Sequence, residues 1–168
     1  MIVYGDCMEK LNINNLTIKQ VNALIKSEKN PPNVLKYNDV YKQIVEGVVY
    51  TGHTYKCEVR DVLRKISYNL LVHTTPIETH FSISLMFTEN HFHLIRFDFG
   101  DNLRHTNYAG TDHEKIVVGS HVHYNASPQK YAPKNVVPIE EIDEFKNIKI
   151  IKDAFVEFLK YTNIKEKS

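Results

Sequence analysis

The chain has 168 residues and a formal net charge of +1, with 42% hydrophobic and 24% charged residues. This length suits one domain that buries a sizeable core, and the composition excludes global disorder. The near-neutral charge excludes a generally cationic nucleic-acid binder, although it leaves room for a local basic patch.

The first predicted element is a helix within residues 15–29. Thr17 followed by Gln20 forms a capping-box pattern, and the two prolines after Asn30 stop the helix. Hydrophobic residues recur between them at helical spacing: Ile18, Val21 and Leu24 or Ile25.

The next segment, residues 34–55, is ambiguous. It reads as a loop or a short helix to about Val45, and as a strand from Val48.

A run of strands occupies the middle of the chain. Residues 53–61, 64–72 and 79–87 alternate between apolar and polar, which is typical of strands with one buried face. Residues 91–99 are apolar on both faces, which indicates a central, covered strand. The short connections favour an antiparallel meander.

The last third completes the predicted fold. Residues 100–115 read as a loop, residues 116–125 as one more strand and residues 126–138 as an extended loop. Pro138 begins a helix with an acidic first turn, and residues 147–163 form a C-terminal helix. The predicted class is α+β: an antiparallel sheet of five or six strands with N-terminal and C-terminal helices packed on it.

Cysteine count and hydropathy set the expected surroundings. Cys7 and Cys57 are too few for a disulfide framework, and no run of about 18 apolar residues predicts a membrane span. No signal-peptide pattern is readable. We therefore expect a single domain over residues 1–168, in the cytoplasm, with reduced thiols and no membrane partner.

Two histidines, His121 and His123, stand one residue apart in the segment GSHVHYN. On a strand they share a face, which suits a general acid and base, or metal binding, but is also typical of a solvated strand. The preceding loop holds His105 and Asn107. If the strands that this loop joins are neighbours, the loop returns near His121 with a third imidazole.

Further polar residues surround this pair in the sequence. Arg96 and Asp98 share one face of a strand that otherwise reads as buried, so they form either a structural ion pair or an anion-binding arginine oriented by the carboxylate. Lys130 and Tyr131 follow the histidines in a basic loop that could cover phosphates and stack a base, or be solvated. His91 and His93 lie near a turn and are interpreted as structural.

The stretches LIRFDF, HTN, GSHVHYN and KYAP together resemble a family of small uncharacterised proteins of Gram-positive bacteria, their phages and mobile elements. That family has an R-x-D strand, an H-x-N loop, a G-x-H-x-H strand and a K-[WY]-A segment. The resemblance covers about residues 94–132 and departs after His105, where the usual Asn-Pro-Asp-Gly is replaced by NYAGTDHEKI. It maps onto Arg96, Asp98, His105, Asn107, His121, His123, Lys130 and Tyr131. It implies no activity, but its setting suggests toxin, phage-defence or anti-defence roles.

Three functions are compatible with these residues. The first is an RNA-cleaving, toxin-like nuclease that uses no metal or cofactor. Its expected catalytic residues are His105, His121, His123 and Arg96, and its expected substrate-binding residues are Asp98, Asn107, Lys130 and Tyr131. The second is a non-enzymatic phage or mobile-element inhibitor or immunity protein that binds a host or phage protein or a nucleic acid. The third is a metal site with three histidine ligands.

Overall fold

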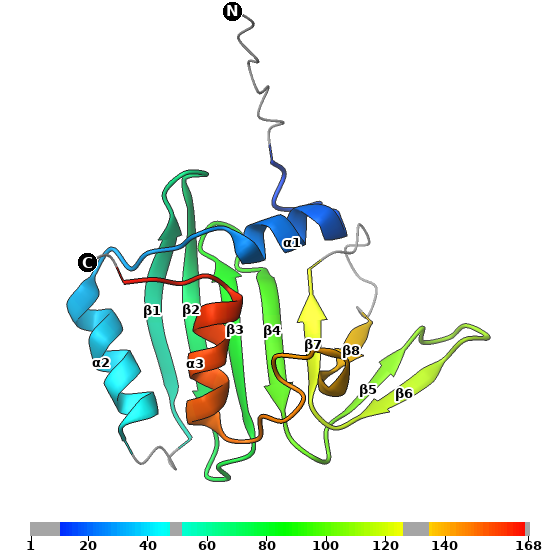
Figure 1. The fold of residues 1–168 in the computed structure, drawn as a ribbon. Helices are drawn as coiled ribbons and strands as arrows, with labels where there is room; N and C mark the ends of the chain where they lie inside the picture. Colours follow the sequence, from blue (N-terminus) through cyan, green and yellow to red (C-terminus); the bar gives the residue numbers. More distant parts are fainter. Residues whose placement is uncertain (1–10, 48–51, 126–134, 167–168) are drawn as a thin grey trace, which may run out of the picture.

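A six-stranded antiparallel sheet forms the centre of the computed structural model, which describes residues 11–47, 52–125 and 135–166 (Figure 1). Its strand order is β1-β2-β3-β4-β7-β8, with all pairs antiparallel. The strands are β1 (Thr54–Asp61), β2 (Ile66–Thr74), β3 (Phe81–Phe87), β4 (His93–Phe99), β7 (His121–Tyr124) and β8 (Val136–Pro138). The predicted α+β class, with its antiparallel sheet of five or six strands, is confirmed.

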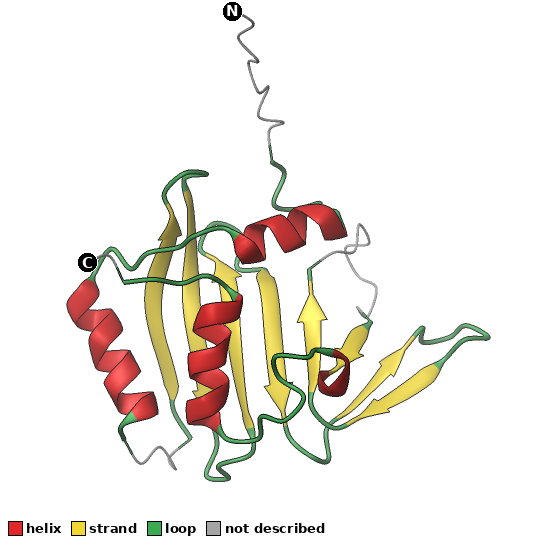
Figure 2. Cartoon of the chain, in the orientation of Figure 1, coloured by secondary structure: helices red, strands yellow, loops and turns green. Residues whose placement is uncertain are grey.

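Helices cover one face of this sheet (Figure 2). They are α1 (Ile18–Lys26), α2 (Val34–Val45) and α3 (Ile151–Tyr161), with a short 3-10 helix η1 (Ile139–Glu141). A two-stranded hairpin, β5 (Arg104–Asn107) with β6 (Lys115–Val118), projects beside β7 and β8 (Figure 1). No helix in the described part of the chain is long and apolar enough to cross a membrane.

The N-terminal helix begins as its sequence predicts. The Thr17 hydroxyl accepts a hydrogen bond from the Gln20 N–H at 3.2 Å, and the Gln20 side chain accepts one from the Thr17 N–H at 2.9 Å. This capping box satisfies backbone donors that a helix start leaves without partners. Val21 and Leu24 are buried, whereas Ile18 is exposed.

The side chain of Lys29 links the C-terminal ends of helices α1 and α3. This side chain is fully buried, and its Nζ atom lies within hydrogen-bond distance of four carbonyl oxygens, which share its N–H donors. The acceptors are Leu24 at 2.6 Å, Ile25 at 3.1 Å, Ser27 at 2.8 Å and Thr162 at 2.9 Å. Because the last carbonyls of a helix lack intrahelical partners, this one side chain serves the ends of both α1 and α3, although burial lowers the pKa of Lys29 to about 7.

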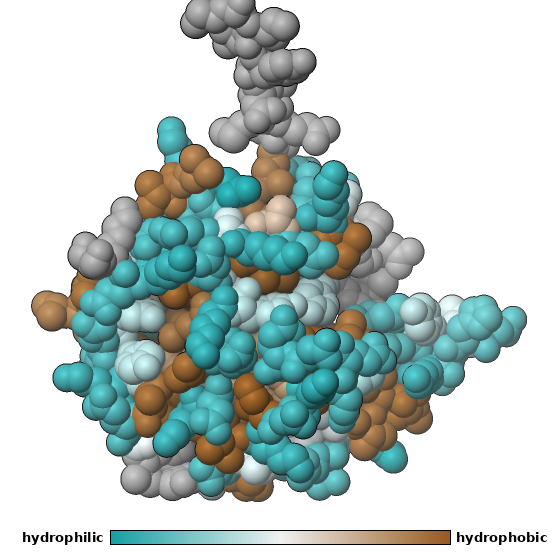
Figure 3. Space-filling model, viewed as in Figure 1, coloured by the Kyte–Doolittle hydropathy of each residue, from teal (hydrophilic) through white to brown (hydrophobic). Residues whose placement is uncertain are grey.

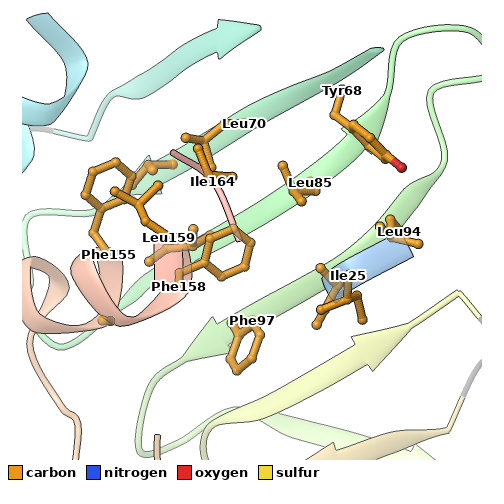
Figure 4. Packing of buried hydrophobic residues seen from close by; sticks show 14 of the residues in the cluster. Ile25, Tyr68, Leu70, Leu85, Leu94, Phe97, Phe155, Phe158, Leu159 and Ile164 are labelled. Atoms are coloured by element: carbon orange, nitrogen blue, oxygen red, sulfur yellow. The ribbon is translucent and has the colours of Figure 1, made fainter. Parts of the chain in front are cut away.

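The core lies between the helices and the sheet. Figure 4 shows Phe155, Phe158 and Leu159 of α3 beside Leu70 and Leu85 of the central strands. The other side of the helices meets solvent, and Figure 3 shows mainly hydrophilic residues there, with scattered hydrophobic ones. The helices therefore act as an amphipathic cover over one sheet face only.

The structure resolves the ambiguous segment and differs from several other predicted elements. The ambiguous segment before Val45 is the helix α2, because Tyr37, Val40 and Ile44 bury one helical face; Val48 lies outside the described residues. The helix predicted at Pro138 is a single 3-10 turn, which ends where the backbone of Ile142 becomes extended.

The predicted loop 100–115 and strand 116–125 are also wrong in detail. The chain forms the hairpin β5–β6, then breaks at Gly119 before β7 begins. Gly119 has a φ of +94°, a backbone conformation that is strained for any residue with a side chain. Its N–H donates a hydrogen bond to the Leu103 carbonyl at 2.8 Å. The hairpin β5–β6 is thus inserted in the chain between β4 and β7, which are neighbours in the main sheet.

Candidate functional site

The pairing of β4 with β7 brings four predicted residues together. Arg96 lies opposite His123, and Asp98 lies opposite His121. Because side chains alternate along a strand, all four project from the sheet face opposite the helices, which we call the open face. The residues between them on these strands, such as Phe97, face the hydrophobic core.

The open face leaves Arg96 less covered than its sequence suggests. Its strand is central, but its side chain is 37% exposed. The prediction of a strand covered on both faces is therefore wrong for this face, because the helices pack only on the other one. The predicted hydrogen bonding is present, since Arg96 donates to Asp98 from Nε at 3.1 Å and from Nη2 at 2.8 Å.

His105 arrives from the hairpin and completes a group of three imidazoles. With His121 and His123 it forms what we call the histidine cluster. Ring centroids are 5.7 Å apart for His105 and His121, 5.3 Å for His105 and His123, and 5.1 Å for His121 and His123. The sequence predicts that His105 approaches the other two, and the structure places it there, on a strand rather than in a loop.

Asn107 holds the hairpin in this place. Its side-chain amide donates to the Val136 carbonyl at 2.9 Å, and its side-chain oxygen accepts from the Val136 N–H at 2.8 Å. The residue is buried. We therefore assign Asn107 a positioning part, in place of the expected contact with substrate, because both ends of its amide already serve β8.

Asp98 connects the members of the site. Its Oδ2 atom lies 2.8 Å from Arg96 Nη2, 3.0 Å from His123 Nε2 and 3.7 Å from His121 Nε2. Burial by itself raises the pKa of this carboxyl, but hydrogen bonds from His123 and Arg96, and their charges, outweigh it and hold the pKa below its usual value. Asp98 is therefore an anion that orients its neighbours.

The hydrogen bond to a backbone carbonyl fixes the tautomer of His121. Its Nδ1 lies 2.8 Å from the Gly119 carbonyl oxygen, which can only accept, so Nδ1 carries the hydrogen. Nε2 then faces Asp98, whose Oδ2 lies 3.7 Å away, and in this tautomer it carries the lone pair. A lone pair held in this way suits a general base or a metal ligand.

His123 has a hydrogen-bond partner in either protonation state. Its Nε2 lies 3.0 Å from Asp98 Oδ2 and 3.1 Å from Arg96 Nη2. A hydrogen on Nε2 is donated to the carboxylate, whereas a bare Nε2 accepts from the guanidinium. This ring can therefore gain or lose a proton without leaving that nitrogen without a partner.

Two hollows meet at this group. A pocket of about 400 Å³, the site pocket, contains the histidine cluster, Arg96 and Asp98, and a second hollow of about 380 Å³ shares Arg96, His105 and His123 with it. The site pocket is also lined by basic or titratable residues that we did not predict as site residues: His73, His80 and Arg104. Alternation along β2 puts His73 on the open face, but only the strand register sets it in a cross-strand row with Ser82, Asp98 and His121.

A family model covers nearly all of the chain. It matches residues 16–164 and is described as a family of unknown function, DUF6978. The chain belongs to the DUF6978 family. This agrees with the expected membership of a small uncharacterised family. No curated protein and no solved structure matches the chain.

The DUF6978 match includes every predicted site residue. Lys130 and Tyr131 lie outside the described residues. The roles expected for them, phosphate contact and base stacking, stay predictions.

The histidine cluster of this DUF6978 member also has the donor set for a metal ion. One nitrogen from each of His105, His121 and His123 can be chosen so that all three lie within 4.8 Å of one another. Three imidazoles can hold a divalent cation such as zinc. The neighbouring guanidinium of Arg96, which already balances the charge of Asp98, weakens the attraction for such a cation.

Proposed function

We propose that this protein cleaves RNA by general acid–base catalysis at the histidine cluster. The observation that supports this is the convergence of three imidazoles and one guanidinium around Asp98 in a single pocket. Cleavage by the adjacent 2′-hydroxyl requires a base, an acid and a cation at the phosphate. The open face supplies each of these groups from its own side chains.

The charge of the site pocket favours an anionic substrate. Its lining includes two arginines, Arg96 and Arg104, and one carboxylate, Asp98. Because Asp98 is paired with Arg96, it adds little repulsion towards a phosphate. A guanidinium held by a carboxylate still has further N–H groups to donate, and these match phosphate oxygens in geometry.

The proton transfers can be assigned to named atoms. His121 Nε2 accepts the proton of the 2′-hydroxyl, whose oxygen attacks phosphorus. The bond from phosphorus to the 5′-oxygen breaks, and that oxygen takes a proton from His105 or His123. The products are a 2′,3′-cyclic phosphate and a free 5′-hydroxyl. Arg96 binds the phosphate oxygens as negative charge develops, and Asp98 orients Arg96 and His123.

The test is a cleavage assay that uses single-stranded RNA and untagged protein in the presence of EDTA. Each of His105→Ala, His121→Ala and His123→Ala should lower the cleavage rate by about 10²–10⁴-fold. His113→Ala is the matched control, because His113 is an exposed histidine on the hairpin. Wild-type cleavage should leave a cyclic phosphate and show a bell-shaped pH dependence. Absence of cleavage, or cleavage that the three variants retain, contradicts the proposal.

The cellular setting belongs to the same proposal. The resemblance to proteins of Gram-positive bacteria, phages and mobile elements motivates a toxin or defence role in the cytoplasm, where RNA is available. Induced expression of the wild type should then arrest growth, and expression of His121→Ala should not. A catalytically silent protein whose His121→Ala variant keeps its full effect would instead be an inhibitor or immunity protein.

A second candidate function has its own observation. The three imidazole nitrogens within 4.8 Å of one another could hold zinc, with a fourth position left for water, as in hydrolytic zinc sites. Metal analysis of untagged protein separates the two functions. One equivalent of zinc, lost together with activity in EDTA, supports the metal site; full activity without metal supports acid–base catalysis.

A further inference from the structure

The second hollow, which we call the side pocket, has a different character from the site pocket. Its volume of about 380 Å³ lies within the range of ligand pockets. Three of its lining residues, Arg96, His105 and His123, belong to the proposed catalytic group. The others come from the start of β4 and the end of β7: His91, Phe92, His93, Tyr124 and Asn125. A ligand that bridges the two hollows would pass the Arg96 guanidinium.

Phe92 presents its ring at this hollow without being packed into the core. The residue is 50% exposed. Its backbone is held, since its N–H donates to the Asn90 side chain at 2.9 Å and its carbonyl accepts from Phe87 at 2.9 Å. The Asn90 amide in turn donates to the Asn14 side chain at 3.1 Å. A fixed backbone with an exposed aromatic ring offers a stacking surface at low entropic cost.

His93 lines the same hollow with a partly buried, neutral ring. Its Nδ1 is buried and has no hydrogen-bond partner among the described residues. Burial lowers the pKa of His93, and the positive charge of Arg96 adds to this effect, so the ring is neutral. His93 therefore adds no positive charge to this hollow, which suits an uncharged planar ligand such as a nucleobase.

We infer that the side pocket binds a nucleobase, stacked on Phe92, of the nucleotide whose phosphate meets Arg96. This inference rests on the proposed function and gives it a substrate geometry: single-stranded RNA, with one base in the side pocket and the scissile phosphate at the cluster. A base in a duplex is stacked on its neighbours and could not enter, so double-stranded RNA is excluded as substrate.

The absence of tryptophan from the chain allows a direct binding test. Phe92→Trp keeps an aromatic face and creates the single indole of the protein. AMP and UMP should quench its fluorescence, whereas ribose 5-phosphate, which has the phosphate but no base, should not. Tyr108→Trp is the matched control, because Tyr108 is an equally exposed aromatic residue on the hairpin, at 52% exposure. Equal quenching of both indoles, or none, overturns the inference.

A second measurement separates this inference from the proposed nuclease. A labelled 2′-O-methyl oligoribonucleotide cannot be cleaved, so its binding is measured without catalysis. Phe92→Ala should raise its dissociation constant by about 10–100-fold, as loss of one base–aromatic stack does, and Phe92→Tyr should restore binding. Unchanged binding and KM in Phe92→Ala, with cleavage intact, overturns the side pocket alone. Binding that depends on Phe92 without any cleavage supports the side pocket and contradicts the nuclease.

Discussion

The side chain of Asn107 pairs with the backbone of Val136 through both ends of its amide, at 2.9 and 2.8 Å. These residues lie on different sheets, Asn107 on β5 and Val136 on β8. These two hydrogen bonds resemble a backbone pair between adjacent β-strands, and they hold the hairpin β5–β6 against the main sheet. Since His105 is two residues from Asn107, its position over the open face depends on this closure.

Loss of the Asn107 side chain should therefore destabilise the protein and disturb the site. Asn107→Ala leaves both Val136 backbone groups without these partners, and should lower the free energy of unfolding by about 1–3 kcal/mol. Urea denaturation measures this change. Thr106→Ala, on the same strand, is the control and should have a smaller effect. If Asn107→Ala matches Thr106→Ala in stability, the pairing does not hold the hairpin.

Asp98 should make stability depend on acid pH. Its pKa is lower in the folded chain than in the unfolded one, so its contribution is complete above the unfolded value of about 3.9 and is lost as pH falls through the folded value. Asp98→Asn should remove this dependence. At pH 7 it should lower stability by about 1–3 kcal/mol, less than for a fully buried pair, because solvent reaches Arg96.

The measurement for Asp98 is a series of urea unfolding curves from pH 7 to pH 3. The difference in free energy of unfolding between the wild type and Asp98→Asn should shrink towards the acid end of the series. A constant difference between the two proteins across the series would show that the charge of this carboxylate does not contribute.

Replacement of Lys29 should have a larger effect on stability. Lys29→Met keeps the length of the side chain but leaves four carbonyl groups, three of them in buried hydrogen bonds, without their shared donor. We expect a loss of about 3–5 kcal/mol in the free energy of unfolding. Lys26→Met, at an exposed position in the last turn of α1, should change it by less than about 0.5 kcal/mol. If Lys29→Met and Lys26→Met unfold at similar temperatures, Lys29 does not stabilise the protein by linking the ends of α1 and α3.

Cys57 should be chemically inert in the folded protein. It is buried on β1, and burial raises the pKa of its thiol to about 11. Because the thiolate is the reactive form, labelling by a disulfide reagent should be at least about a hundredfold slower in the folded chain than in urea. A Cys7→Ser background removes the other thiol. Rapid labelling without denaturant would show that β1 opens readily.

Local patterns predicted the elements whose stability is local. The capping box at Thr17, the period-two alternation from Phe81 to Phe87 and the helical spacing of Phe155 and Leu159 each predicted an element that the structure contains. These patterns are readable because a strand repeats every two residues and a helix every 3.6. The hairpin β5–β6 was missed because its boundary depends on the left-handed backbone of Gly119, which sequence alternation across residues 116–125 conceals.

For the site, the sequence by itself determined which side chains share a face: Arg96 with Asp98, and His121 with His123. Only the tertiary structure decided that these two pairs meet, through the register that sets Arg96 against His123 and Asp98 against His121. It also decided the place of His105, through contacts between β5 and β8. Alternation is a property of each strand alone, whereas register and hairpin docking arise from contacts between segments far apart in the chain.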